Sequence, residues 1–91
     1  MGALLQAMGK LEEARPLYEE ALQAKRETLG DRHPNTLISI SNMATLLQGM
    51  GQLEEARPLY EEAAQGSKET LGHHHPSTLI YIKNLVSLPK R

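Results

Sequence analysis

Apolar residues along the chain recur every three or four positions, the spacing that places them on one side of an α-helix. After Pro34, one such stripe consists of Leu37, Ile40, Ala44 and Leu47. A second stripe beside it consists of Ile38, Met43, Leu46 and Met50. A helix that is apolar on two sides must be covered on two sides, so this pattern predicts a helix packed between two others.

Proline and glycine mark the ends of this helix and of the next one. Pro34 suits the first helical position, where its missing N–H is not needed, and Gly51 suits the left-handed backbone that follows a helix end. A second helix is predicted from about Leu53 to Leu71, because its apolar residues keep the helical period. Gly72 is expected to end it. The two helices together predict a helical hairpin.

The chain repeats itself with a period of 42 residues. The sequence LEEARPLYEEA occurs from Leu11 to Ala21 and again from Leu53 to Ala63. At this offset about 30 of the 49 overlapping positions are identical, so the chain consists of two 42-residue periods and seven further residues. A single hairpin cannot bury its own apolar surface, and we therefore expect neighbouring hairpins to stack.

The repeat register predicts how the helices follow one another. Met1 aligns with Met43 in the middle of the first helix of a hairpin, so residues 1–9 are expected to form only part of such a helix. A second helix is expected over 10–30, and a complete hairpin over 34–72. Residues 76–88 are expected to form another partial first helix. We assign the whole chain, 1–91, to one all-α domain.

Composition narrows the classes of function. The chain has 91 residues, with 10 Lys and Arg against 11 Asp and Glu, and a formal net charge of −1. This balance argues against a nucleic-acid or anionic-membrane surface, which needs clustered positive charge. No apolar run approaches the roughly 20 residues of a membrane span. The sequence has no Cys and no signal-like N-terminus, so we expect a cytoplasmic protein.

The small and apolar residues of the hairpin carry a degenerate form of a known motif. The pattern W-x2-L-G-x2-Y followed by A-x3-F corresponds here to Ile40-x2-Met43-Ala44-x2-Leu47 followed by Ala56-x3-Tyr60. The chain therefore resembles the tetratricopeptide repeat family. Its 42-residue period, eight longer than the usual 34, resembles the repeats of kinesin light chain.

This resemblance implies antiparallel helical hairpins stacked as a short right-handed solenoid. It also implies a non-catalytic interaction module or scaffold, which binds a peptide or partner protein on the concave face made by the first helices of the hairpins. The positions that the family uses for contact fall on Gln6, Ser41, Asn42, Thr45, Gln48, Lys83, Asn84 and Ser87. Asn42 and Asn84 are the best-supported contacts, because an amide offers both a donor and an acceptor to a ligand backbone. The alternatives are that both simply face solvent or that they satisfy backbone groups between the repeats.

The partial helix at the C-terminus suggests a second function, self-association. Its expected exposed stripe consists of Leu79, Ile82, Leu85 and Val86. Tyr81 joins this set because it replaces the polar Ser39 of the preceding repeat, and an exposed aromatic residue is typical of interfaces. We expect these residues to dock on a second copy and to form a homo-oligomer, either a dimer or a head-to-tail array. The alternative is a monomer with frayed ends.

Two further clusters suggest metal or acid–base chemistry. His73, His74 and His75 are adjacent, but consecutive loop residues do not converge easily on one ion, so a solvated loop is favoured over a metal site. Paired carboxylates, as in glycosidases, occur at Glu12, Glu13, Glu19 and Glu20. They lack a His, Cys or Ser partner, and a solvated helix face is favoured. We predict no enzyme activity and no cofactor.

Overall fold

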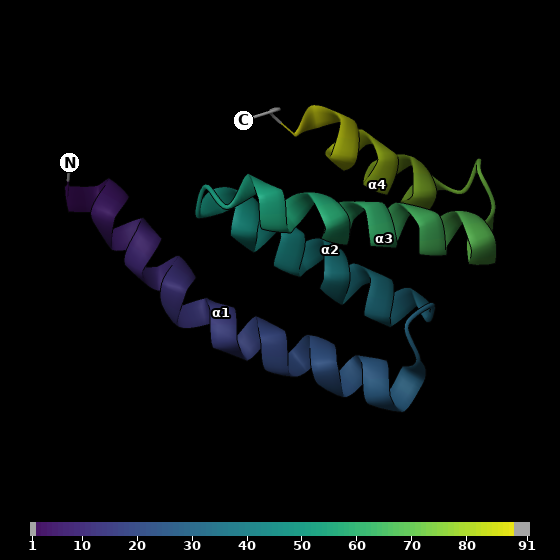
Figure 1. Ribbon diagram of the computed structural model, residues 1–91, viewed down its shortest axis with the longest axis horizontal. Helices are drawn as coiled ribbons and strands as arrows, with labels where there is room; N and C mark the ends of the chain where they lie inside the picture. The colour runs from purple at the N-terminus through teal and green to yellow at the C-terminus, as the bar shows by residue number, and fades with distance from the viewer. Residues whose placement is uncertain (1, 89–91) are drawn as a thin grey trace.

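The computed structural model describes residues 2–88, with side chains from residue 9 onward. Its helices, in chain order, are α1 (Gly2–Leu29), α2 (Pro34–Gly49), α3 (Leu53–Leu71) and α4 (Pro76–Ser87). Consecutive helices run antiparallel, and α2 lies between α1 and α3 (Figure 1). This arrangement confirms the all-α fold of stacked helical hairpins. Within residues 2–88, no helix is both long enough and apolar enough to cross a membrane.

Glycines with a left-handed backbone mark the three connections between helices. The φ angles of Gly30, Gly51 and Gly72 are 89°, 82° and 94°. A residue with a Cβ atom pays about 1–2 kcal/mol for this conformation, whereas glycine adopts it freely. At the α2–α3 turn, the N–H of Gln52 donates to the carbonyl of Leu47 at 2.8 Å. The helix ends predicted at Gly51 and Gly72 are confirmed.

Histidine side chains cap the first turns of α2 and α4. Nδ1 of His33 accepts a hydrogen bond from the N–H of Asn35 at 3.1 Å, and Nδ1 of His75 accepts one from Ser77 at 3.1 Å. Each capping residue is followed by a proline at the first helical position, as predicted for Pro34. The His–Pro pair of each period therefore starts a helix.

The structure corrects the predicted boundary in the first helix. A turn is expected near Gly9, between a partial helix over 1–9 and a helix over 10–30, but α1 continues without a break from Gly2 to Leu29. Gly9 is the counterpart of Gly51, where the chain does turn. Folding back a segment of about two helical turns would bury little apolar surface, whereas continuing the helix adds a backbone hydrogen bond for each residue.

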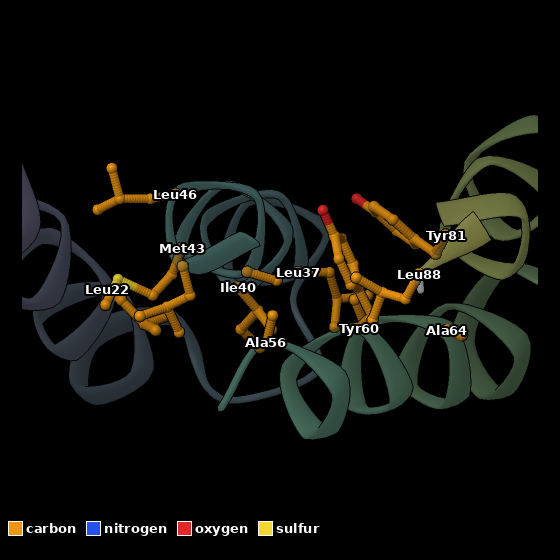
Figure 2. Packing of buried hydrophobic residues seen from close by; sticks show 13 residues of the cluster. Leu22, Leu37, Ile40, Met43, Leu46, Ala56, Tyr60, Ala64, Tyr81 and Leu88 are labelled. Carbon is orange, nitrogen blue, oxygen red and sulfur yellow. The ribbon is translucent and has the colours of Figure 1, made fainter. Parts of the chain in front are cut away.

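The apolar core lies between adjacent helices, and α2 contributes most to it. Its buried members are Leu37, Ile40, Met43, Ala44, Leu46 and Leu47. Leu22 of α1 covers one side of α2, and Ala56 and Tyr60 of α3 cover the other (Figure 2). The two-sided burial predicted for this helix is confirmed, with one exception. Ile38, which the second stripe placed inside, is 50% exposed.

The last helix also packs differently from the prediction. Tyr81 is only 7% exposed and joins the core beside Leu88 and Tyr60 (Figure 2), so the exposed position expected for it is wrong. It lies on the side of α4 that packs against α3, and burial there removes the large ring from water. The expected stripe is divided. Ile82 and Leu85 are partly buried against the core, while Leu79 and Val86 are 52% and 77% exposed.

Two equivalent polar contacts join each hairpin to the helix before it. The hydroxyl of Thr36 in α2 donates to the carbonyl of Lys25 in α1 at 3.4 Å. At the counterpart positions, the hydroxyl oxygens of Thr78 and Ser67 lie 2.6 Å apart between α4 and α3. Throughout the described part of the chain, each buried side-chain nitrogen or oxygen has a hydrogen-bond partner. These contacts avoid the cost of burying unpaired polar groups.

Ion pairs connect α1 directly to α3 across the edge of α2. The guanidinium of Arg26 donates to both carboxylate oxygens of Glu62, at 2.6 and 3.0 Å, and this hydrogen bonding raises the pKa of Arg26. Arg15 makes an equivalent bridge to Glu55 at 3.0 Å. Exposed pairs add little stability, but a bidentate arginine contact fixes the relative position of two helices.

The close approach at Gly66 yields a first prediction. A Cβ atom at this position would lie 2.7 Å from Cδ2 of Leu37, which is 1% exposed. We expect Gly66→Ala to lower the free energy of unfolding by about 1 kcal/mol, because overpacking outweighs the gain in helix propensity. Urea denaturation followed by circular dichroism measures this change. The matched control is Ala24→Gly at the counterpart position in α1, where Ala24 is exposed and the loss of about 1 kcal/mol comes from helix propensity alone. A Gly66→Ala variant more stable than the wild type would contradict the close approach.

The histidine cap yields a second prediction. His33→Ala removes the acceptor for the Asn35 N–H and should lower the free energy of unfolding by about 1 kcal/mol. His33→Asn supplies another side-chain acceptor and should retain most of the stability. His74→Ala, at an exposed loop position, is the control and should change stability by less than about 0.5 kcal/mol. Equal effects of His33→Ala and His74→Ala in thermal or urea denaturation would argue against the cap.

Candidate functional site

The exposed side of α2 carries a row of side chains, one of which, Thr45, also contacts Tyr60 of α3. Ile38, Asn42 and Thr45 are exposed and recur at helical spacing. Asn42 is the central residue of this outward row and one of the predicted ligand contacts. Its exposure leaves the amide accessible to a ligand.

The other predicted contacts on α2 are buried or bind other residues of the fold. Ser41 is buried, at 8% exposure. The hydroxyl of Tyr60 donates to Oε1 of Gln48 at 3.1 Å, and its oxygen lies 2.8 Å from Oγ1 of Thr45. Thr45 and Gln48 therefore bind the polar end of a buried tyrosine. The predicted row is thus divided between contacts inside the fold and the exposed Asn42.

A hollow of about 240 Å³ adjoins Asn42 between α1 and α2. It is lined by Tyr18, Ala21, Ser39 and Asn42. Tyr18 is 42% exposed, so part of its ring is available to a ligand. The small side chains of Ala21 and Ser39 leave the space open. The α1/α2 hollow therefore combines an aromatic ring, a hydroxyl and an amide.

The second repeat carries a larger side chain at one of the positions that match this hollow. The equivalent positions are Tyr60, Ala63, Tyr81 and Asn84. Tyr81 stands where the first repeat has Ser39, and its buried ring packs in the core near Tyr60 (Figure 2). Loss of water around the ring raises the pKa of the Tyr81 hydroxyl. Ser39 thus lines an open hollow in the first repeat, whereas Tyr81 at the matching position of the second repeat is buried.

The other predicted contact residues lie on α4 and in the N-terminal part of α1. On α4, Lys83 and Ser87 are exposed and Asn84 is half-buried. Asn84 follows the half-exposed Ile80 by four residues, as Asn42 follows Ile38. The side chain of Gln6 lies outside the described residues. An isoleucine and an asparagine thus recur together on the outward sides of α2 and α4.

Sequence reasoning missed three residues of this site. Apolar periodicity assigned Ile38 to the buried side of its helix, and Ile80 belonged to none of the predicted stripes. Tyr18 matches the buried Tyr60 in sequence, yet it lines the α1/α2 hollow. A signal for the hollow was present in the repeat comparison, because the small Ser39 stands one period before the large Tyr81.

The histidine and carboxylate clusters have structural roles where the structure shows contacts. His75 caps α4, while His73 and His74 are exposed. Within residues 2–88, no three His, Asp or Glu side chains are placed to hold a metal ion. The four glutamates considered for acid–base chemistry are exposed, and Glu19 pairs with Arg15 at 3.4 Å. These positions are typical of a solvated helix surface.

Comparison with known proteins places this architecture in a family. No curated protein matched the chain. The family model described as tetratricopeptide repeat matches twice, over residues 1–64 and 39–88. The two matches overlap across most of α2 and all but the last turns of α3. Their combined span covers every described helix, and the chain therefore belongs to the tetratricopeptide repeat family.

Proposed function

We propose that this chain is a protein–protein interaction module that binds a peptide segment of a partner on the outward side of α2. Tetratricopeptide repeats are generally protein-binding and non-catalytic, which supports a role in binding rather than in catalysis. The single observation that carries the proposal is the position of Asn42, which is exposed and lines the α1/α2 hollow.

The chemistry of this surface suits an extended peptide. The Asn42 amide offers a donor and an acceptor, the pair that a peptide unit requires. Ile38 lies one helical turn before it and supplies apolar contact at 50% exposure. A ligand side chain that enters the hollow contacts the Tyr18 ring. Backbone pairing with apolar anchoring is the combination that gives peptide sites both affinity and orientation.

The second repeat extends the same surface. Ile80 and Asn84 repeat the Ile38 and Asn42 pair on α4, so one extended peptide can follow both helices. Tyr81 occupies the place of Ser39, and we infer that the ligand places a side chain only in the first hollow. The 42-residue period supports the kinesin-light-chain type of repeat as part of this proposal. The cytoplasmic location stays a prediction.

Selection from a random-peptide phage library on the wild-type chain provides the probe for a test. The tightest selected peptide is synthesised, and its affinity is measured by isothermal titration calorimetry. We expect Asn42→Ala to weaken binding about tenfold, since it removes two hydrogen bonds worth about 1 kcal/mol each or less. Ser39→Tyr copies Tyr81 and should weaken binding at least as much by filling the hollow.

The control for this test is Gln65→Ala, which also replaces an exposed amide but lies on α3. It should leave the affinity of the selected peptide unchanged. Circular dichroism and urea denaturation establish that each variant folds. Wild-type affinity in both Asn42→Ala and Ser39→Tyr would refute the proposed site, as would a library selection that enriches no peptide.

A further inference from the structure

The two terminal helices carry counterparts of surfaces that are paired inside the molecule. On α2, three residues that the register matches to α4 are completely or almost completely buried: Leu37, Ile40 and Ala44, at 1%, 0% and 0% exposure. Their counterparts on α4 are Leu79, Ile82 and Val86. Leu79 and Val86 remain 52% and 77% exposed. We call Leu79, Ile82 and Val86 the α4 face.

The first helix shows the complementary relation. α3 packs on α2 through residues that include Ala56, Tyr60 and Ala63, at 0%, 2% and 0% exposure. Their counterparts on α1 are Ala14, Tyr18 and Ala21, in a stretch of identical sequence. Tyr18 is 42% exposed and the adjacent Leu17 is 67% exposed. We call Ala14, Leu17, Tyr18 and Ala21 the α1 face.

We propose that the α1 face of one copy packs on the α4 face of a second copy, in the way that α3 packs on α2 within one chain. The α3 sequence that packs on α2 is repeated in α1. Most of the α2 sequence that α3 covers is repeated in α4. Such a contact joins two different surfaces, so it is heterologous and builds a head-to-tail array. It goes beyond peptide binding, because it joins α1 of one copy to α4 of another, although the α1 face shares Tyr18 and Ala21 with the α1/α2 hollow.

Polar contacts in the chain support the same pairing. The Tyr60 hydroxyl oxygen lies 2.8 Å from Oγ1 of Thr45 between α3 and α2. Tyr18 and Ser87 stand at the counterpart positions of α1 and α4, and Ser87 keeps the hydroxyl group. Both side chains are exposed. The docked copies can therefore form the same tyrosine–hydroxyl contact.

Charges are complementary as well. Inside the chain, Arg26 of α1 binds Glu62 of α3 at 2.6 and 3.0 Å. The counterpart of Arg26 one period later is Lys68 on α3. The counterpart of Glu62 one period earlier is Glu20 on α1. In the array, Lys68 of one copy faces Glu20 of the next. Opposite charges at these positions favour the head-to-tail orientation over other contacts of the same apolar surfaces.

Two substitutions make the contact between copies looser than the internal one. Val86 replaces the fully buried Ala44, and Ala24 replaces Gly66, where a Cβ atom would meet Leu37 at 2.7 Å. Both add volume at positions that match the buried contact between α2 and α3. The copies therefore associate more weakly than the paired helices of one chain pack, and association requires high protein concentration.

The test is sedimentation velocity of the full chain over a concentration series up to the millimolar range. We expect the average mass to rise above the 10.1 kDa of one chain as concentration increases. Leu17→Lys blocks the α1 face and Val86→Lys blocks the α4 face, and each variant alone should remain a single chain. Both residues are well exposed in one copy, so these variants should fold.

Mixing the two variants distinguishes the head-to-tail contact from a symmetric one. Leu17→Lys retains its α4 face and Val86→Lys retains its α1 face, so an equimolar mixture should form a 1:1 dimer and nothing larger. Ile38→Lys is the control, because Ile38 is an exposed apolar residue on neither face. It should associate like the wild type. A mixture that stays monomeric, or a Leu17→Lys variant that still dimerises, overturns the proposal.

Val86→Ala tests the packing geometry. It restores the small residue found at Ala44, so we expect association about threefold or more tighter than that of the wild type. Unspecific attraction between apolar surfaces predicts the opposite, because the variant exposes less apolar area. Weaker association of Val86→Ala, or a constant mass of 10.1 kDa for the wild type at every concentration, would overturn the pairing.

Discussion

The burial of α2 on two sides is the constraint on which the rest of the structure depends. Its two apolar stripes cannot be covered by one partner, so α1 and α3 must both pack against it. This requirement explains the tight left-handed turns at Gly30 and Gly51, which reverse the chain before and after α2. It also leaves one narrow side of α2 uncovered. Asn42 lies on that side, so the accessible site is a consequence of how the core is built.

The repeat produces two interhelical spaces with the same backbone plan and different surfaces. Between α1 and α2, the small Ser39 leaves the α1/α2 hollow open beside Tyr18. Between α3 and α4, Tyr81 occupies the corresponding position and is buried. Tyr81 in place of Ser39 also adds buried apolar surface to α4, which is shorter than α2. A single aromatic residue therefore stabilises the last helix and makes the two repeats chemically unequal, although most of their residues are identical.

In this fold, polar contacts determine how the helices are placed relative to one another more than they add to stability. The Arg26–Glu62 and Arg15–Glu55 pairs hold α1 against α3 on a partly exposed edge, where ion pairs contribute little free energy. The threonines at the first turns of α2 and α4 make the buried contacts, to the Lys25 carbonyl and the Ser67 hydroxyl. Tyr60 combines both roles, because its ring fills the core while its hydroxyl binds Gln48. The register between hairpins is thus specified by polar groups, and most of the burial comes from aliphatic and alanine side chains.

Sequence alone determined the helices, their glycine and proline boundaries, the 42-residue repeat and the two-sided burial of α2. These features follow from local backbone preferences and from apolar periodicity, and both can be read from a single sequence. Only the tertiary structure decided that α1 continues through Gly9, that Ile38 faces outward and that Tyr81 faces the core. Periodicity gives the direction in which a side chain points from its own helix. Whether that side chain is buried depends on which other helices pack against that side. The hollow beside Asn42 has the same origin, since it exists only where the side chains of two helices leave space between them.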